Sequence, residues 1–250
     1  MRILRARQPD SDWLAHAHWS RTGRHSFSAK DRDVVIETDV ITSAQPFDGI
    51  EVRADNVRFD LLALATPSRN AASISRGATP ELDVPAYSQY HGDERGWCSA
   101  TSLAMIDAYY GRDGDVPETA RAVFDSAYNG TGNWSFNVAY SGSLGLAATV
   151  AYLRNLDHAA QFIREGIPLA LSYSWKGNEL PGAPVEHSDG HLVVLRGFTA
   201  AGDCIVNDPA APGVRVVYER EAIERIWLRN KGIAYVIAEP ATDIERLINT

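Results

Sequence analysis

The sequence lacks the features that define several large classes of protein. Its 250 residues include only two cysteines, Cys98 and Cys204, which excludes a disulfide framework and leaves at most one bridge. Neither cysteine belongs to a CxxC pair, so a zinc knuckle or a thioredoxin-like site is not expected. No stretch approaches the roughly 18 apolar residues that a membrane-spanning helix needs. The first residues, MRILRARQPDSDWLAHAHW, contain no apolar core of a signal peptide. The sequence as given therefore predicts a cytoplasmic protein, or a secreted one if a leader precedes it.

Positive charge is also scarce. The chain carries 24 Lys and Arg residues against 32 Asp and Glu residues, for a formal net charge of −8. Only three of the basic residues are lysines, and the arginines form no run. An acidic surface disfavours nucleic acid and anionic lipid as partners. Hydrophobic residues make up 45% of the chain, which is ordinary for a globular protein and sufficient for a core without disulfides or metals.

The chain divides into two regions of different pattern. We expect residues 1–79 to form a β-rich N-terminal region that ends in a polar linker, and residues 1–32 look irregular. Alternating and β-branched residues predict short strands in this region, at 34–42, 50–54 and 57–65. We assign this region no role.

Residues 80–250 show an α+β pattern in which helices come first and strands later. Apolar spacing predicts helices at 99–110, 117–128, 143–155, 157–165 and 219–229. Strands are predicted at 167–175, 191–198, 203–207, 214–218 and 233–238. This order indicates a domain with a helical half and an antiparallel sheet half.

Cys98 directly precedes the predicted helix 99–110. A thiol at a helix N-terminus faces the positive end of the helix dipole and unpaired backbone N–H groups, both of which favour the nucleophilic thiolate. The same N–H groups can stabilise an oxyanion. The alternative is a buried structural cysteine, which is the common fate of a free thiol.

His191 and Asp208 lie at the ends of neighbouring predicted strands. If strands 191–198 and 203–207 form a hairpin, His191 lies across from Asn207 or Asp208. A carboxylate there would hold the imidazole in the correct tautomer, and the imidazole would serve as the base that a thiol nucleophile needs. Taken singly, His191 and Asp208 are ordinary strand-end and turn residues. Together with Cys98 they match a nucleophile, base and orienting acid.

Other polar and aromatic residues complete the set of candidates. Gln89, nine residues before Cys98, has a side-chain amide that could donate to an oxyanion, although a loop glutamine is the simpler interpretation. Trp134, Phe136 and Tyr140 form an aromatic-rich segment that suits either a substrate groove or the core. Candidate substrate-binding residues are Trp97, Trp134 and Tyr140.

His187, Asp189 and His191 are the residues that could suggest a metal site. The spacing of four residues between the two histidines does not bring them onto one cation at the start of a strand, so we predict no metal and no other cofactor.

The order Gln, Cys at a helix, His and Asp resembles the papain-like cysteine peptidases, and within them peptidase family thirty-nine, whose founding members trim double-glycine leaders from bacteriocin precursors. The segments that carry the resemblance are VPAYSQY (84–90), GWCSATSLAMIDAYYG (96–111), GIPLALSY (166–173), GHLVVLRGF (190–198) and CIVNDPA (204–210). The segment GNWSFNVAYSGSLGL (132–146) resembles stand-alone bacterial members. The resemblance implies a papain-like fold over about 82–238 and the roles of nucleophile, base, orienting residue and oxyanion donor for Cys98, His191, Asp208 and Gln89.

Two departures accompany the resemblance. The family usually has Cys-Gly-Pro at the nucleophile, where this chain has Cys98-Ser99-Ala100, and the interval from Gln89 to Cys98 is longer than in the leader peptidases. No phosphate-binding GxxxxGK[ST] motif is present, so transporter-coupled export does not follow. The expected activity is hydrolysis of peptide or amide bonds in a peptide or protein substrate. Acyl transfer by the same residues and a catalytically silent binding domain are the alternatives, and the oligomeric state is open.

Overall fold

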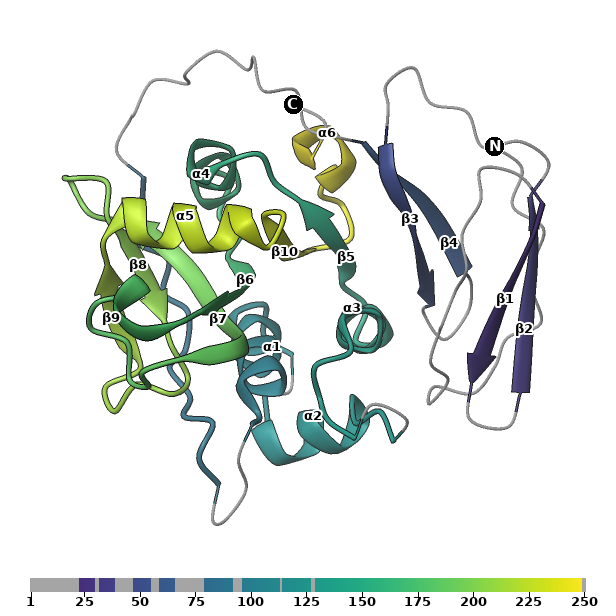
Figure 1. The fold of residues 1–250 in the computed structure, drawn as a ribbon, viewed down its shortest axis with the longest axis horizontal. Helices are drawn as coiled ribbons and strands as arrows, with labels where there is room; N and C mark the ends of the chain where they lie inside the picture. The colour runs from purple at the N-terminus through teal and green to yellow at the C-terminus, as the bar shows by residue number, and fades with distance from the viewer. Residues whose placement is uncertain are drawn as a thin grey trace.

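The structure of the protein is a computed structural model that describes residues 79–91, 96–112, 114–126 and 129–248, together with four strands of the N-terminal region. These strands form two antiparallel pairs (Figure 1), β1 (Gly23–Ala29) with β2 (Arg32–Thr38) and β3 (Phe47–Ala54) with β4 (Phe59–Ala65). Strands β2, β3 and β4 overlap the predicted ones. The expectation that residues 1–32 are irregular was wrong, because β1 finds its hydrogen-bonding partner in β2. Residues 68–78, which make up most of the expected linker, lie outside the described residues.

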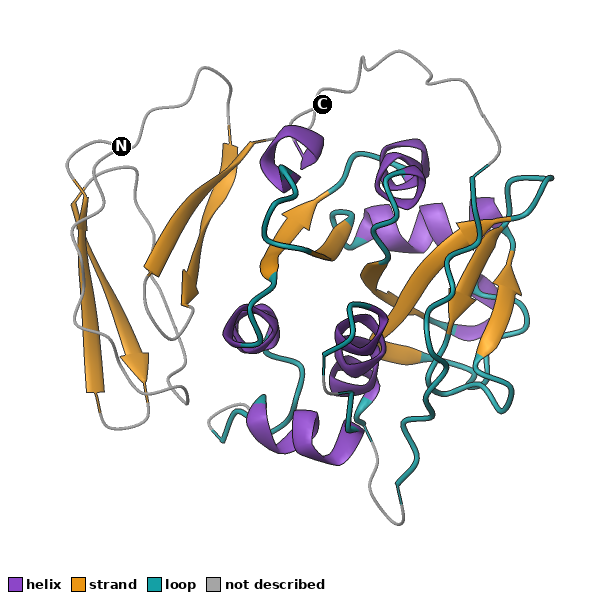
Figure 2. Cartoon of the chain, turned by 180° about the vertical axis from the view of Figure 1, so that it is seen from behind, coloured by secondary structure: helices purple, strands orange, loops and turns teal. Residues whose placement is uncertain are grey.

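One antiparallel sheet dominates the second region (Figure 2). Its strands follow the order β5–β10–β6–β7–β8–β9. Their bounds are β5 (Ala147–Tyr152), β6 (Leu169–Trp175), β7 (Ser188–Phe198), β8 (Cys204–Asn207), β9 (Arg215–Tyr218) and β10 (Ile233–Ala238). Every strand of this sheet except β5 coincides with a predicted strand. The three consecutive strands β7, β8 and β9 form a meander, as expected for short connections between antiparallel strands.

Helices pack against this sheet and against one another. They are α1 (Cys98–Tyr109), α2 (Val116–Ala122), α3 (Trp134–Ser143), α4 (Leu156–Arg164), α5 (Arg220–Arg229) and α6 (Ile244–Ile248), with a 3₁₀ turn, η1 (Gly177–Glu179), after β6. Helix α1 contacts β7, α2 and α3, whereas α5 packs on β6. Figure 1 shows α1, α2 and α3 gathered beside the sheet. The predicted α+β class, with a helical and a sheet half, is confirmed.

Helix α1 is the central element of the helical half. All nine residues from Ser99 to Asp107 are buried, including the polar side chains of Ser99, Thr101, Ser102 and Asp107. The sequence predicted a helix with one apolar face. Burial on all sides instead means that neighbouring elements enclose the helix completely, which fixes the position of its first residue, Cys98.

Two helix predictions were wrong in detail. The predicted helix 143–155 is the end of α3, a turn at Gly145 with a φ of 85°, and then strand β5. The alanine-rich sequence of β5 suits a helix locally, but β5 pairs along its whole length with β10, and this tertiary pairing overrides the local preference. The predicted helix 117–128 ends at Ala122, because Asp125 instead pairs with Gly130 in an isolated bridge.

Candidate active site

Cys98 is the first residue of helix α1. The chain enters the helix through Gly96, whose φ of 79° is readily adopted by glycine, and through Trp97, whose carbonyl accepts the first intrahelical hydrogen bond from Thr101 N at 2.8 Å. No side chain in the described part of the protein caps Trp97. The Cys98 side chain is half-buried, and both cysteines are free thiols, so the single bridge left open by the sequence is not formed.

His191 of β7 and Asp208, directly after β8, lie within hydrogen-bond distance of each other. In the β7–β8 pair, Val194 lies opposite Asn207, so Asp208 is the first residue beyond the strand. The His191 Nε2 atom lies 2.8 Å from Asp208 Oδ1. The expected pairing of β7 with β8 is present, but the expected register was wrong: Val194, and not His191, lies opposite Asn207, and His191 pairs with Tyr173 of β6.

The imidazole of His191 also interacts with the thiol of Cys98 through a side-chain hydrogen bond. Because Nε2 is engaged with Asp208, Nδ1 is the ring nitrogen left available for this hydrogen bond. The rings of Trp175 and Tyr173 meet the imidazole edge-on, with centroid distances of 5.5 and 6.5 Å. The ring is therefore held between an acid, a thiol and two aromatic side chains.

Contacts between α1 and β7 keep the thiol and the imidazole together. The hydroxyl of Ser102, on the turn of α1 after Cys98, donates to the carbonyl of Leu192, the residue after His191, at 3.1 Å. Hydrogen bonding from the backbone of Leu192 and of Ser99 lowers the pKa of the Cys98 thiol. Both residues therefore support a negative charge on the sulfur.

The ionisation of these groups is shifted in the direction that an ion pair requires. Burial by itself raises the pKa of Cys98, but the hydrogen bond and the charge of His191 outweigh it and leave the pKa below that of an ordinary thiol. Burial by itself lowers the pKa of His191, but its hydrogen bonds with Asp208 and Cys98 leave the pKa raised. The result favours a thiolate beside an imidazolium.

Asp208 is fully buried and nevertheless ionised. Burial raises the pKa of its carboxyl, while hydrogen bonds from His191, Tyr218 and the Ala210 N–H bring the pKa below its usual range. Oδ1 accepts from the Ala210 N–H at 2.9 Å, and Oδ2 accepts from the Tyr218 hydroxyl at 2.7 Å. No local sequence pattern singled out Tyr218. Only the predicted strand 214–218, next to strand 203–207, hinted that it would be near.

Asn207, the alternative neighbour of His191, points elsewhere. Its side-chain amide donates to the carbonyls of Val84 and Pro85 at 3.2 and 3.0 Å, and its Oδ1 accepts from Arg196 at 3.2 Å. Arg196 is the extra residue of a bulge in β7, and its carbonyl accepts from Leu82 N. Asn207 and Arg196 thus attach the extended segment 82–85 to the sheet.

Gln89 lies farther along that segment, beside the Asp208 turn. Its backbone N–H donates to the Pro209 carbonyl at 2.9 Å, and its side chain is 8% exposed. The Oε1 atom is buried without a hydrogen-bond partner among the described residues. Gln89 is not among the residues that line the cleft described next.

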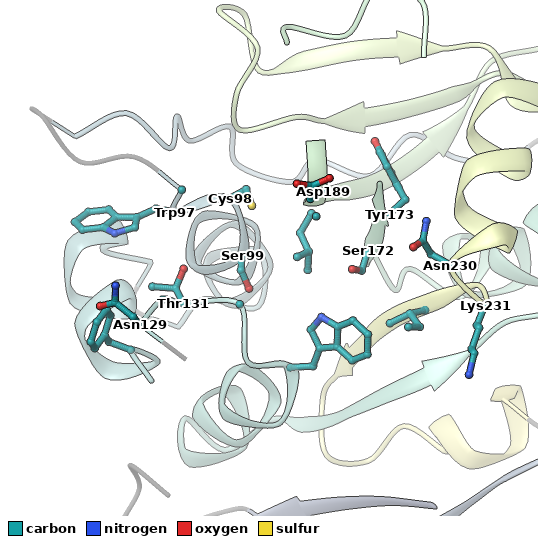
Figure 3. Close-up of a pocket in the computed structure, with 18 of the residues that line it drawn as sticks. Trp97, Cys98, Ser99, Asn129, Thr131, Ser172, Tyr173, Asp189, Asn230 and Lys231 are labelled. Atoms are coloured by element: carbon teal, nitrogen blue, oxygen red, sulfur yellow. The ribbon is translucent and has the colours of Figure 1, made fainter. Parts of the chain in front are cut away.

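A cleft of about 1090 Å³ opens at Cys98 (Figure 3). Trp97 and Trp134, both candidate substrate-binding residues, line it. Phe124, which the sequence analysis did not single out, also lines it, with 43% of its surface exposed against 36% for Trp134. The third candidate, Tyr140, does not line the cleft and packs instead against the hydrophobic core. The cleft further includes residues from the sheet half and its neighbouring turns, namely Ser172, Tyr173, Asp189, Gly190, Leu192, Asn230, Lys231 and Ile233.

The residues considered for a metal do not come together. His187 is exposed, Asp189 lines the cleft, and His191 is bonded to Asp208. Within the described ranges, no group of three or more His, Cys, Asp or Glu side chains has an arrangement that could hold a metal ion.

The part of the chain that the structure describes includes no helix that is both long and apolar enough to cross a membrane.

Comparisons with known proteins relate the second region of the chain to a family. Residues 81–235, more than half of the chain, match the sequence profile of the Peptidase_C39 like family. A C39-like peptidase from Bacillus anthracis has a similar solved structure, with a TM-score of 0.52 and 18% identity over 66% of this chain and 98% of that one. This likeness shows that the fold is that of a papain-like peptidase domain.

Two further solved structures are similar. A double glycine motif protease from an AMS/PCAT transporter, in complex with the leader peptide, has a TM-score of 0.44 and 23% identity over 66% of this chain and 96% of that one. The peptidase domain of Streptococcus ComA has a TM-score of 0.44 and 16% identity over 62% and 97%. A search of the curated proteins returns no match.

We expect Cys98 to react with iodoacetamide at pH values well below the ordinary thiol pKa of about 8.5. Its pKa is lowered, so thiolate persists into the acidic range, and the alkylation rate should fall only as the pH drops through that lowered pKa. His191→Ala removes the compensating cation and should move the inflection upward. The measurement is the alkylation rate against pH, followed by mass spectrometry.

Cys98→Ser provides the matched control for this experiment. Cys204 is buried, and burial raises its pKa, so the control should remain unlabelled across the same pH range. A single inflection near the ordinary thiol value in the wild-type protein would contradict the ion pair.

Proposed function

Because this chain belongs to the Peptidase_C39 like family, we propose that it is a cysteine peptidase that hydrolyses peptide or amide bonds with Cys98 as nucleophile. The observation that supports this most directly is the hydrogen-bonded series from Asp208 through His191 to Cys98, which ends in the cleft. A nucleophile, a base and an orienting acid in this order are what acyl transfer through a covalent intermediate requires.

In the first half of the reaction, the Cys98 thiolate attacks the carbonyl carbon of the substrate. The carbonyl π electrons move to oxygen and form an oxyanion. The tetrahedral intermediate then collapses: the C–N bond breaks, and the His191 imidazolium gives its proton to the departing amine. The products of this half are a free amine, a thioester on Cys98 and a neutral imidazole.

In the second half, water replaces the amine. Neutral His191 takes a proton from the water as it attacks the thioester carbonyl, and the C–S bond breaks. The acid product leaves, and the thiolate and imidazolium are restored. Asp208 stays ionised throughout, since its role is to orient the imidazole and stabilise its positive charge. No cofactor takes part in either half.

The oxyanion is proposed to bind at the start of α1. The Cys98 backbone N–H belongs to the first turn, whose N–H groups have no intrahelical partner, and the helix dipole favours negative charge there. We propose the Gln89 side chain as the second donor. Its backbone hydrogen bond to Pro209, the neighbour of Asp208, supports a position close to the triad.

The cleft supports a peptide as the substrate. Its volume exceeds that needed for a small amide, and Phe124 and Trp134 expose large apolar surfaces in it. Covering an exposed aromatic side chain with an apolar side chain of the ligand removes apolar surface from water, which favours binding. We therefore propose that Trp97, Trp134 and Phe124 bind apolar side chains of the substrate.

The test of this proposal is cleavage of a proteome-derived peptide library by the purified protein, with the new termini identified by mass spectrometry. We expect a set of cleaved sequences with apolar residues at defined positions from the scissile bond. Cys98→Ala should reduce cleavage to the detection limit and leave the fold intact. Cys204→Ala should retain activity and lose stability of about 1 kcal/mol, as a small buried side chain does.

The same experiment separates the alternative functions. Products that carry an added primary amine in place of water would identify an acyl transferase. No cleavage, together with alkylation of Cys98 as slow as that of an ordinary thiol, would identify a silent binding domain. Cleavage retained by Cys98→Ala would overturn the proposal.

Asp208 and Asn207 are adjacent in the chain and are expected to differ in effect. Asp208→Asn keeps the shape and loses the charge, so kcat/KM should fall by roughly one to four orders of magnitude. Asn207→Ala should change kcat/KM far less and lower the free energy of unfolding by about 1–3 kcal/mol, because the Pro85 carbonyl loses its side-chain donor and the Val84 carbonyl keeps only Arg196. Steady-state kinetics and thermal unfolding of both variants check this, and the reverse order of effects would make Asn207 the orienting residue.

Gln89→Ala should lower kcat about 10²–10³-fold, the usual cost of removing one oxyanion donor. An oxyanion donor acts only after the nucleophile has attacked, so the pH profile of Cys98 alkylation should stay unchanged in this variant. A kcat within a few-fold of the wild-type value, measured on a peptide from the library, would remove Gln89 from the mechanism.

A further inference from the structure

We propose that Tyr218 is a positioning residue of the active site, whose hydroxyl holds the Asp208 carboxylate in the orientation in which it receives the hydrogen bond of His191. This inference rests on the proposed function, because it assigns Tyr218 a part in the reaction of the Cys98 site. Tyr218 acts through Asp208 and does not line the cleft.

The position of Tyr218 follows from the β7–β8–β9 meander. Tyr218 is the last residue of β9 and pairs with Cys204, the first residue of β8. Its ring is 1% exposed, and its hydroxyl donates to Asp208 Oδ2 at 2.7 Å. The hydrogen bond therefore joins the far end of β9 to the residue that follows β8.

The two oxygens of Asp208 have separate partners. Oδ1 receives His191 Nε2 at 2.8 Å and the Ala210 N–H at 2.9 Å, whereas Tyr218 provides the hydrogen bond to Oδ2 among the described residues. The backbone of Asp208 is fixed as well, since its N–H donates to the Val214 carbonyl at 2.7 Å. Rotation of the carboxylate about its last torsion would move both oxygens, and the Tyr218 hydroxyl adds the hydrogen bond that holds Oδ2.

The burial of Asp208 makes this hydrogen bond consequential. An ionised carboxylate that is removed from water is stable only if its oxygens are hydrogen-bonded, and hydrogen bonds to charged groups are stronger than those between neutral groups. Without the Tyr218 hydroxyl, Oδ2 would lack this donor, and Asp208 would accept a proton at a higher pH. A protonated Asp208 no longer stabilises the His191 imidazolium.

Several titratable groups surround Asp208. His191 on β7 and Tyr218 on β9 bond to it directly, and Tyr173 on β6 lies within electrostatic range of Asp208, Tyr218, Cys204 and Cys98. Burial and the Asp208 charge raise the pKa of Tyr218, and burial raises that of Tyr173. Both phenols remain protonated over the pH range of the alkylation experiment, so the Tyr218 hydroxyl donates throughout that range.

Tyr218→Phe removes only the hydroxyl. We expect the inflection in the pH profile of Cys98 alkylation to move upward by about one pH unit, and kcat/KM on a library peptide to fall about tenfold, since a hydrogen bond to a charged group is being lost. A merely structural tyrosine would lower the melting temperature and leave the pH profile in place. The pH profile therefore distinguishes positioning from packing, and it needs no substrate.

Tyr109→Phe is the matched control. Tyr109 is the last residue of α1 and donates its hydroxyl to the Gly166 carbonyl at 3.0 Å, so this variant loses a tyrosine hydrogen bond at the opposite end of the helix from Cys98. Its alkylation profile and kcat/KM should match those of the wild-type protein.

The outcomes separate this inference from the proposed function. An unshifted alkylation profile in Tyr218→Phe, with cleavage that still depends on Cys98, overturns the role of Tyr218 alone. A shifted profile with no Cys98-dependent cleavage supports the Tyr218–Asp208 interaction and overturns the peptidase proposal. An equal shift in Tyr109→Phe would also overturn the role of Tyr218, since the shift would then be a general effect of destabilisation.

Discussion

The site depends on a carboxylate that is kept ionised without contact with water. Asp208 is 0% exposed, and a lone charge in such a position would be protonated. Three donors prevent this: the imidazole of His191, the backbone N–H of Ala210 and the hydroxyl of Tyr218. The negative charge that they preserve in turn raises the pKa of His191, and the charged imidazole lowers the pKa of Cys98. The reactivity of a thiol on α1 is thereby controlled by residues on β7, β9 and the turn after β8.

Strand β7 carries a bulge close to the residues that hold the active-site segments in place. Arg196 is the bulge residue of β7. Its carbonyl accepts from the Leu82 N–H, and its guanidinium donates to the Val84 carbonyl and to Asn207 Oδ1. These contacts hold the extended segment that leads to Gln89, and the Gln89 N–H then bonds to Pro209, next to Asp208. Asn207 and Asp208 therefore divide two tasks between neighbouring residues: one attaches a segment of backbone, and the other orients the imidazole. Bulges commonly occur beside active sites for such reasons.

The sequence predicted the three central side chains of the site better than the helices, strands and hydrogen bonds that hold them in place. Cys98 before a helix, and His191 and Asp208 at strand ends, are local signals, and the structure brings these three side chains together. Strand β5 was predicted as helix because AATVAY carries no strong local preference for a strand, and its state is decided by β10, some 80 residues away in the chain. Helix α3 was not predicted, although Asn133 caps it by accepting from the N–H groups of Ser135 and Phe136. Tyr218 could not be assigned, since its contact with Asp208 depends on the register of two strand pairs and the path of the intervening turn.

The departure from Cys-Gly-Pro at the nucleophile is explained by how α1 is enclosed. Ser99 is buried, and its hydroxyl lies 3.4 Å from that of Tyr235 on β10, while Ala100 is 0% exposed. One turn later, Ser102 bonds to Leu192 on β7. The start of α1 is thus attached to β10 through the Ser99 hydroxyl, which a glycine at position 99 would not provide, and to β7 through the Ser102 hydroxyl one turn later. Because Cys98 begins a helix that is held on all sides and His191 lies on one of the strands that holds it, the separation of thiol and imidazole is set by the packing of the core. The loop before Cys98 can therefore change in length and sequence without moving the Cys98 thiol away from the His191 imidazole.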